Sequence, residues 1–192
     1  MSFSGRISNI WVSSIAKLDE QMVKVPDDIV KQYQQYGAFD SVDELMERSK
    51  LWILTSDAII DSPKPIMPHT IEVGGLTTQP AKKLPEDIQS FLDGAEDGVI
   101  LVSFGSMMSK FPVILLRKFL EAFNRIERHR IIWRLTNVSS EFKIPNFIRQ
   151  GGWMPQNDIL AHPKVKLFIT HSGNNGQFEA LYHGVNTFYG LN

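Results

Sequence analysis

Residues 153–184 read WMPQNDILAHPKVKLFITHSGNNGQFEALYHG, and this stretch is the most informative part of the sequence for the fold. Its middle part, residues 164–170, ends in a short apolar run with a β-branched residue, the pattern of a strand largely buried in a sheet. Residues 171–176 form a polar turn rich in Gly and Asn. Residues 177–183 are typical of a short helix, which Gly184 is suited to end. Strand, turn and helix make half of a βαβ unit and therefore predict a parallel sheet.

Polar side chains of this stretch fall where such sheets bind ligands. In parallel α/β sheets, ligands lie beyond the carboxyl ends of the strands, where unpaired helix N–H groups attract phosphate. His171 follows the predicted strand and can donate a hydrogen bond to a diphosphate oxygen. Asn175 and Glu179 are four residues apart and share one face of a helix. A carboxylate there can accept hydrogen bonds from two neighbouring hydroxyl groups.

Each residue alone also has a plain structural interpretation. A single histidine after a strand is more often a capping or structural residue than a ligand contact. Taken alone, Glu179 is a solvated helix residue, Trp153 belongs to the core, and Gly151-Gly152 is a turn. The order and spacing of the set, rather than any single member, favour a binding site.

The rest of the chain has two unequal parts. Up to about residue 60 we predict mainly helix, over residues 7–17, 27–36 and 42–48, the last capped by Asp40 or Ser41. Short apolar runs at 51–55 and 58–60 are ambiguous between strand and helix. Residues 62–86 carry five of the ten prolines and Gly74-Gly75, which predicts an extended linker with one short strand at best.

From Asp97 onward, strands alternate with helices. The pattern predicts strands at 99–103, 131–135 and 164–170, and helices at 112–128 and 157–162. This alternation implies an α/β fold whose parallel sheet is covered on both faces.

The composition excludes several protein classes. With 192 residues, 43% of them apolar and 21% charged, the chain is an ordinary globular protein of one or two domains. A net charge of −1 gives no sign of a nucleic-acid or anionic-membrane surface. The absence of cysteine excludes a disulfide scaffold and a thiolate metal site. No apolar run approaches the roughly 20 residues that span a bilayer, and the sequence does not begin with a signal peptide.

Fixed residue types recur at set spacing in three places. The most specific is W-x-P-Q-x-D-x-L-x-H-P at 153–163, followed by F-I-T-H-x-G-x-N-G-x-x-E-A at 168–180. The others are V-S-F-G-S-M at 102–107 and the stretch 57–85 with its prolines and paired glycines. Together they resemble the signature of the UDP-glycosyltransferase family, and the chain looks like its animal UDP-glucuronosyltransferase branch.

The resemblance implies a partial GT-B fold, with the Rossmann-like parallel sheet of the C-terminal, donor-binding domain. It divides the chain into a remnant of the N-terminal acceptor domain (1–60), a proline-rich linker (61–97) and a truncated UDP-sugar-binding domain (98–192). Two positions depart from the family pattern. Ser172 stands where the family usually has a second glycine, and Asn186 interrupts its Gly-x-Pro turn.

Carried over position by position, the resemblance implies a half-site for a UDP-sugar donor. Trp153 would lie against the uracil ring. Gln156 would contact the base or the ribose through its amide, and Glu179 would accept hydrogen bonds from the ribose.

The phosphate side of the implied half-site involves other residues. His171 would bind the diphosphate with help from the backbone of Asn175 and Gly176. Ser106 would approach the phosphates or the sugar, and Arg134 is a weaker candidate, more readily an ion-pairing surface residue.

The activity implied is transfer of a hexosyl or glucuronosyl group from UDP-sugar to a small lipophilic acceptor. UDP-sugar is the donor substrate, so we expect neither a cofactor nor a metal. The catalytic His–Asp pair of the family belongs to the N-terminal domain, and no histidine here matches it, so we assign no catalytic residue. The family's Asp–Gln pair, which contacts the donor sugar, would fall past residue 192.

We therefore expect a chain that is marginally stable and inactive by itself, with no nucleic-acid partner and a possible homo- or hetero-oligomeric state. The family implies the endoplasmic reticulum membrane. An alternative is a non-catalytic UDP-sugar-binding or regulatory short form that pairs with a full-length enzyme. A third hypothesis, a self-sufficient enzyme of other chemistry, lacks a recognisable acid/base pair in the sequence.

Overall fold

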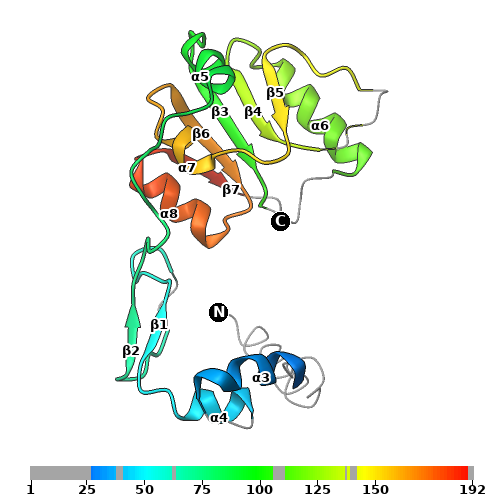
Figure 1. Ribbon diagram of the computed structural model, residues 1–192. Coiled ribbons are helices and arrows are strands. Elements are labelled where there is room, and N and C mark those ends of the chain that lie inside the picture. The colour runs from blue at the N-terminus through cyan, green and yellow to red at the C-terminus, as the bar shows by residue number, and fades with distance from the viewer. Residues whose placement is uncertain are drawn as a thin grey trace, which may run out of the picture. The chain divides into compact units, whose positions relative to one another are not determined.

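The computed structural model describes residues 27–37, 41–61, 64–105, 111–136, 138 and 142–189 (Figure 1). The chain divides into two compact units, of which the first comprises Met1–Trp52 and Met67–Thr70, and the second Ile53–Ile66 and Ile71–Asn192. The expected helix over residues 7–17 and the expected site residue Ser106 lie outside the described residues.

Short helices open the described part of the chain, and strands and helices make up the part that follows. The elements, in chain order, are α3 (Asp27–Tyr33), η1 (Gln34–Tyr36), α4 (Val42–Glu47), β1 (Trp52–Leu54), β2 (Thr70–Glu72), α5 (Glu86–Asp93), β3 (Val99–Ser103), α6 (Val113–Asn124), β4 (Arg130–Arg134), β5 (Ile148–Gly151), α7 (Gln156–Leu160), β6 (Val165–Thr170), α8 (Asn174–Tyr182) and β7 (Asn186–Tyr189).

Five of the described strands form one parallel sheet in the order β5-β4-β3-β6-β7. The central strand β3 is buried at every position, as expected for an apolar strand covered on both faces. After β3 the chain adds β4 and β5 on one side, then returns to add β6 and β7 on the other. The strand order therefore reverses between β3 and β6. In sheets of this kind, ligands bind beyond the carboxyl ends of the strands at that reversal.

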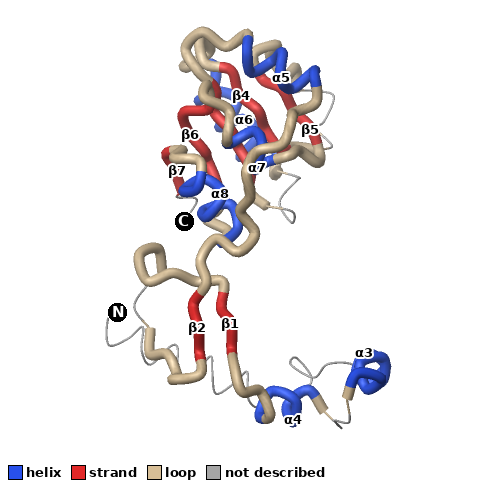
Figure 2. Tube along the Cα trace, turned by 60° about the vertical axis from the view of Figure 1, so that its left-hand side comes forward, coloured by secondary structure: helices blue, strands red, loops and turns tan. Residues whose placement is uncertain are grey.

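Helices cover both faces of this sheet, as predicted. On one face α6 packs through Leu116, Leu120 and Phe123 against a core that contains Trp133. The other face is covered by α5, α7 and α8, whose buried residues are Ile88, Leu92, Ile159, Leu160, Phe178 and Ala180. Figure 2 shows α7 and α8 beside one another and next to β6 and β7. The expected α/β fold with a doubly covered parallel sheet is confirmed.

Local signals in the sequence account for several element ends. β3 spans the predicted residues, and α6, β4, α7 and β6 overlap their predicted ranges. The Ser41 hydroxyl accepts a hydrogen bond from the backbone N–H of Glu44 at 3.1 Å and caps α4. Gly184 ends α8 with a φ of 67°, and the N–H of Val185 bonds to the carbonyl of Ala180 at 2.9 Å. This Schellman-type ending confirms the predicted stop.

Other expectations were wrong or incomplete. Helix α8 begins at Asn174, three residues before the predicted start, because part of the expected Asn/Gly turn is already helical. Residues 58–60 form a turn rather than a strand or helix, and Gly151 ends β5 instead of lying in a turn. Neither α5, β5 nor β7 was predicted.

The segment expected as a linker, residues 61–97, contains α5 and part of the main core. Leu84, Ile88, Leu92 and Ala95 are buried in the same cluster as residues of β3 and β6. The domain limits at residues 60 and 97 stay a prediction.

Before this segment, β1 and β2 pair as a two-stranded parallel sheet, called here the small sheet.

Candidate functional site

The predicted site residues of the Gly/Asn turn lie at the reversal of strand order. Strands β3 and β6 are neighbours and end in register, with Ser103 opposite Thr170. Gly105 follows β3 by two residues, and His171 follows β6 directly. The chain thus brings the two motifs that contain these residues, which are far apart in sequence, to the edge of the sheet where doubly wound folds bind ligands.

The His171 ring lies between two glycine backbones. A Cβ atom added at Gly105 would lie 2.7 Å from His171 Cε1, and one at Gly173 would lie 2.6 Å from His171 Nε2. Any side chain at either position would displace the ring. His171 is exposed, and among the described residues its ring nitrogens make no hydrogen bond, so they are open to a ligand. A capping role for this histidine is therefore not supported.

The first turn of α8 adds unpaired backbone donors beside His171. Gly173 is the N-cap residue and supplies no side-chain bond. The first intrahelical hydrogen bond runs from the N–H of Gln177 to the Gly173 carbonyl at 3.1 Å. The N–H groups of Asn174, Asn175 and Gly176 therefore have no carbonyl partner within the helix, and such groups attract anions.

Gln156 and Glu179, predicted from separate motifs, are in direct contact. Gln156 begins α7, and its Nε2 donates a hydrogen bond to Glu179 Oε2 in α8 at 2.6 Å. Gly176 permits this approach, since a Cβ there would lie 3.3 Å from the same Gln156 nitrogen. The amide thus orients the carboxylate, whose second oxygen can accept a hydrogen bond from a hydroxyl donor.

Trp153 lies on the surface. Its side chain is 81% exposed, whereas the next residue, Met154, is buried in the core of the α7 and α8 face. The alternative that Trp153 belongs to the core is therefore wrong. An exposed indole three residues before Gln156 offers a flat apolar surface to an aromatic ligand.

Two further residues bear on this edge of the sheet. Arg134 Nε donates a hydrogen bond to the Gly152 carbonyl at 3.0 Å, which fixes the turn just before Trp153. Ser172 has a φ of 65° and is the one non-glycine residue with positive φ in the described part of the chain. This left-handed conformation is the physical reason why glycine is favoured at that position.

Metal ligands and membrane spans can be judged only for the described residues. Within them, no three His, Asp or Glu side chains gather closely enough to hold a metal ion. In that same part of the chain, every helix is too short or too polar to cross a membrane.

Comparison with known proteins identifies the family. The model of the family described as UDP-glucoronosyl and UDP-glucosyl transferase matches residues 1–188. The chain belongs to this family. Rat 2-hydroxyacylsphingosine 1-beta-galactosyltransferase is 34% identical over 188 residues, which is 96% of this chain and 34% of that protein. Human UDP-glucuronosyltransferase 3A1 is 32% identical over 190 residues, 96% of this chain and 36% of that protein.

The chain spans about a third of the length of these curated relatives. They are named as transferases, so this UDP-glycosyltransferase family is one of enzymes, as predicted.

Solved structures confirm the fold. UGT71G1 of Medicago truncatula, complexed with UDP-glucose, matches 78% of this chain and 32% of its own with a TM-score of 0.53 at 23% identity. UGT89C1 of Arabidopsis thaliana, complexed with UDP, matches 63% of this chain and 32% of its own with a TM-score of 0.50 at 25% identity. The expected partial GT-B architecture is therefore correct.

Contacts between distant segments were missed by the sequence analysis. Asn174 bonds to Thr55 and Asn175 to Thr77, in both cases about a hundred residues away along the chain. Gly105 and Gly173 were noted within motifs, but not as the walls of the His171 ring. Gly105, Gly173 and His171 all lie in polar turns just after strand ends, and this shared position could have suggested that the two glycines pack on the histidine ring.

Proposed function

We propose that this chain binds the UDP moiety of a UDP-sugar donor, and that it serves glycosyl transfer to a small lipophilic acceptor. One observation carries the proposal: the exposed His171 ring lies between two glycine backbones, beside the free N–H groups of α8, where the strand order reverses. An imidazole and backbone amides together provide several donors for a diphosphate, and in the described part of the chain no carboxylate pairs with the ring.

The remaining residues fit the base and the ribose. The exposed Trp153 ring would stack on uracil. Glu179, held by Gln156, would accept hydrogen bonds from the ribose hydroxyls. His171 and the amides at Asn175 and Gly176 would bind the diphosphate, and Ser106 would complete the phosphate side. These roles follow the family resemblance and are supported by the contacts of Gln156 and by the free donors of α8.

The transfer step needs groups beyond this half-site. We assign no general base, and the identity of the sugar and the acceptor, the endoplasmic reticulum location and an oligomeric state remain predictions. UDP binding without any turnover of acceptors would favour the alternative, a non-catalytic or regulatory form that pairs with a complete enzyme.

Calorimetric titration with UDP tests the proposal. The unsubstituted chain should bind UDP, and a His171→Ala, Glu179→Ala variant should bind it at least about a hundredfold more weakly, as expected when two charged or polar contacts of roughly 1.5 kcal/mol each are lost. Glu121→Ala, an exposed position on α6 across the sheet, is the matched control and should bind normally. CDP and ADP should bind more weakly than UDP. Equal binding by the double variant and the control would reject the proposed site.

A further inference from the structure

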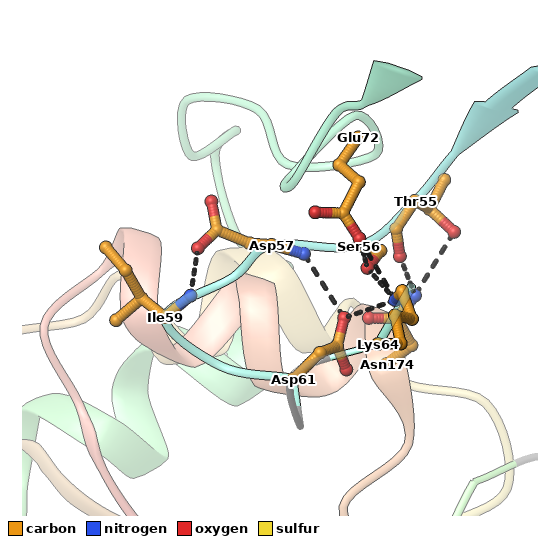
Figure 3. A network of polar contacts seen from close by, with 8 residues as sticks. All are labelled: Thr55, Ser56, Asp57, Ile59, Asp61, Lys64, Glu72 and Asn174. Carbon is orange, nitrogen blue, oxygen red and sulfur yellow. Dashed lines mark hydrogen bonds and ion pairs between the residues drawn. The ribbon is translucent and has the colours of Figure 1, made fainter. Parts of the chain in front are cut away.

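Three polar side chains form a closed group at the end of the small sheet (Figure 3). The Ser56 hydroxyl donates a hydrogen bond to Glu72 Oε1 at 2.7 Å and accepts one from the Lys64 ammonium. Lys64 Nζ also lies 3.1 Å from Glu72 Oε1. Ser56 is 6% exposed, so its hydroxyl depends on these two partners rather than on water. Ser56, Lys64 and Glu72 are called here the Ser56 triad.

Within the Ser56 triad, the Ser56 hydroxyl can adopt only one orientation. A carboxylate only accepts hydrogen bonds and an ammonium only donates them, so the hydroxyl must point its proton at Glu72 and its lone pair at Lys64. Asp61 lies 3.7 Å from Lys64 Nζ and accepts a hydrogen bond from the backbone N–H of Asp57 at 3.2 Å. Groups from β2 and from the segment between β1 and β2 therefore fix the backbone at Ser56.

Thr55 connects this group to α8. The peptide group between Thr55 and Ser56 is planar, so fixing Ser56 also orients the Thr55 carbonyl. That carbonyl accepts a hydrogen bond from Asn174 Nδ2 at 2.6 Å, and Thr55 Oγ1 lies 3.2 Å from the same nitrogen (Figure 3). Asn174 is the first residue of α8. The Ser56 triad is thus connected to the first turn of α8 through one peptide plane and one hydrogen bond.

Two further contacts, from residues 74–77, hold the beginning of α8. The backbone at Gly74 packs directly on Phe178, because a Cβ at Gly74 would lie 2.8 Å from that ring. Thr77 Oγ1 lies 3.4 Å from Asn175 Oδ1. Since α8 has nine residues and no side-chain N-cap, contacts from outside the helix decide where its first N–H groups point.

We propose that the Ser56 triad positions the diphosphate-binding amides of α8, acting through Thr55 and Asn174. The inference rests on the proposed function, because it concerns the same UDP site. Donors bind a phosphate well only when they are held within about 0.5 Å of the productive geometry. Loss of the Ser56 hydroxyl frees the Thr55 carbonyl, and the first turn of α8 then no longer presents its amides in one arrangement. Gln156 and Glu179 hold each other and do not depend on this link.

Comparing UDP with uridine tests the proposal in the full chain. Ser56→Ala and Asn174→Ala should raise the Kd for UDP about five- to tenfold, the effect of one lost hydrogen bond, and leave the Kd for uridine within about twofold. Ser56→Thr and Lys64→Arg keep the hydroxyl and the cation and should retain the affinity for UDP. Thermal melting establishes that each variant is folded. A parallel loss of UDP and uridine affinity, or no loss at all, would overturn the proposal.

A measurement without ligand separates this inference from the proposed function. The side-chain amide resonance of Asn174 in a ¹⁵N spectrum reports its hydrogen bond to Thr55. It should move in Ser56→Ala towards its position in a chain where the bond is broken, and stay in place in Ser56→Thr. An unmoved resonance in Ser56→Ala would overturn the link whether or not UDP binds. Absence of UDP binding by the unsubstituted chain would instead overturn the proposed function, and the diphosphate role with it.

Discussion

The two glycines that enclose the His171 ring are needed for different reasons. Gly105 has a φ of 78°, a conformation that side-chain-bearing residues rarely adopt, so both its backbone and its space require glycine. Gly173 has a φ of −62° and a ψ of 139°, which any residue can adopt. At Gly173 the requirement is therefore for space alone, and substitution there changes the ring position without straining the backbone.

Replacing Gly173 with alanine should move the ring and weaken UDP binding. The new Cβ would start 2.6 Å from His171 Nε2, too close for both atoms to keep their places. We expect the Kd for UDP to rise about tenfold, close to 1.4 kcal/mol, with calorimetry as the measurement. Gly37→Ala is the control, because a Cβ there meets nothing within 4 Å.

A double substitution tests the cause of this loss. If Gly173→Ala acts by displacing the ring, adding it to His171→Ala should cost no further affinity. Additive losses would show that Gly173 contributes to binding by another route.

The residues of the site were predictable where a motif fixes their type and spacing, and not where the chain folds back on itself. Residue type and position singled out His171, Gln156 and Glu179. Spacing along the chain could not show that the last two bond to each other, because they lie in different helices. The Asn174–Thr55 bond joins residues 119 positions apart, and nothing local marks either one as its partner.

Among the elements, the small sheet depends on a charged residue and should respond to pH. The pKa of Glu72 is lowered from 4.5, first by the Ser56 hydroxyl and then by the Lys64 ammonium, while burial and, to a smaller extent, Asp61 act in the opposite sense. A lowered pKa means that the folded chain favours the carboxylate. The stabilisation is therefore fully present above pH 4.5 and is lost as the pH falls below that value through the pKa of the folded state.

Urea unfolding of the unsubstituted chain and of Glu72→Gln at pH 7 and pH 3 measures this contribution. The unsubstituted chain should be the more stable of the two at pH 7, and the difference should shrink at pH 3. Asp61 is present in both proteins, so taking the difference between them removes the part of its titration that does not depend on Glu72. A difference that does not change with pH would contradict the assigned role of the Glu72 carboxylate.

The elements α5, β5 and β7 were not predicted because their local sequence pattern was weak or was outweighed by a stronger signal nearby. The helix α5 lies just after closely spaced prolines, which favoured an extended linker over its two buried residues, Ile88 and Leu92. Strand β5 has one buried apolar residue, Ile148, and ends in glycine, and β7 is mostly exposed. Both edge strands are specified by pairing with β4 and β6 rather than by their own sequence.

At the scale of the whole chain, substitutions in α5 test whether residues 84–95 belong to the folded core or form a linker. Leu92 is 0% exposed and belongs to the core shared by β3, α7 and α8. Leu92→Ala should therefore lower the free energy of unfolding by about 2–5 kcal/mol. Ile114→Ala on α6, where the side chain is 74% exposed, should change it by less than about 0.5 kcal/mol. Equal stability of the two variants in urea would mean that residues 84–95 behave as a linker.

The exposed position of Trp153 gives the chain an optical reporter of its own. Its indole is 81% exposed, whereas Trp133 is fully buried against the rings of Phe111, Phe119 and Phe123. Iodide in solution reaches an exposed indole and quenches its fluorescence, but it does not reach a buried one. Saturating UDP should therefore reduce the fraction of emission that iodide quenches, and Trp153→Phe should abolish this change. Stacking of a base on Trp153 would therefore be detected as protection of this one indole from quenching by iodide.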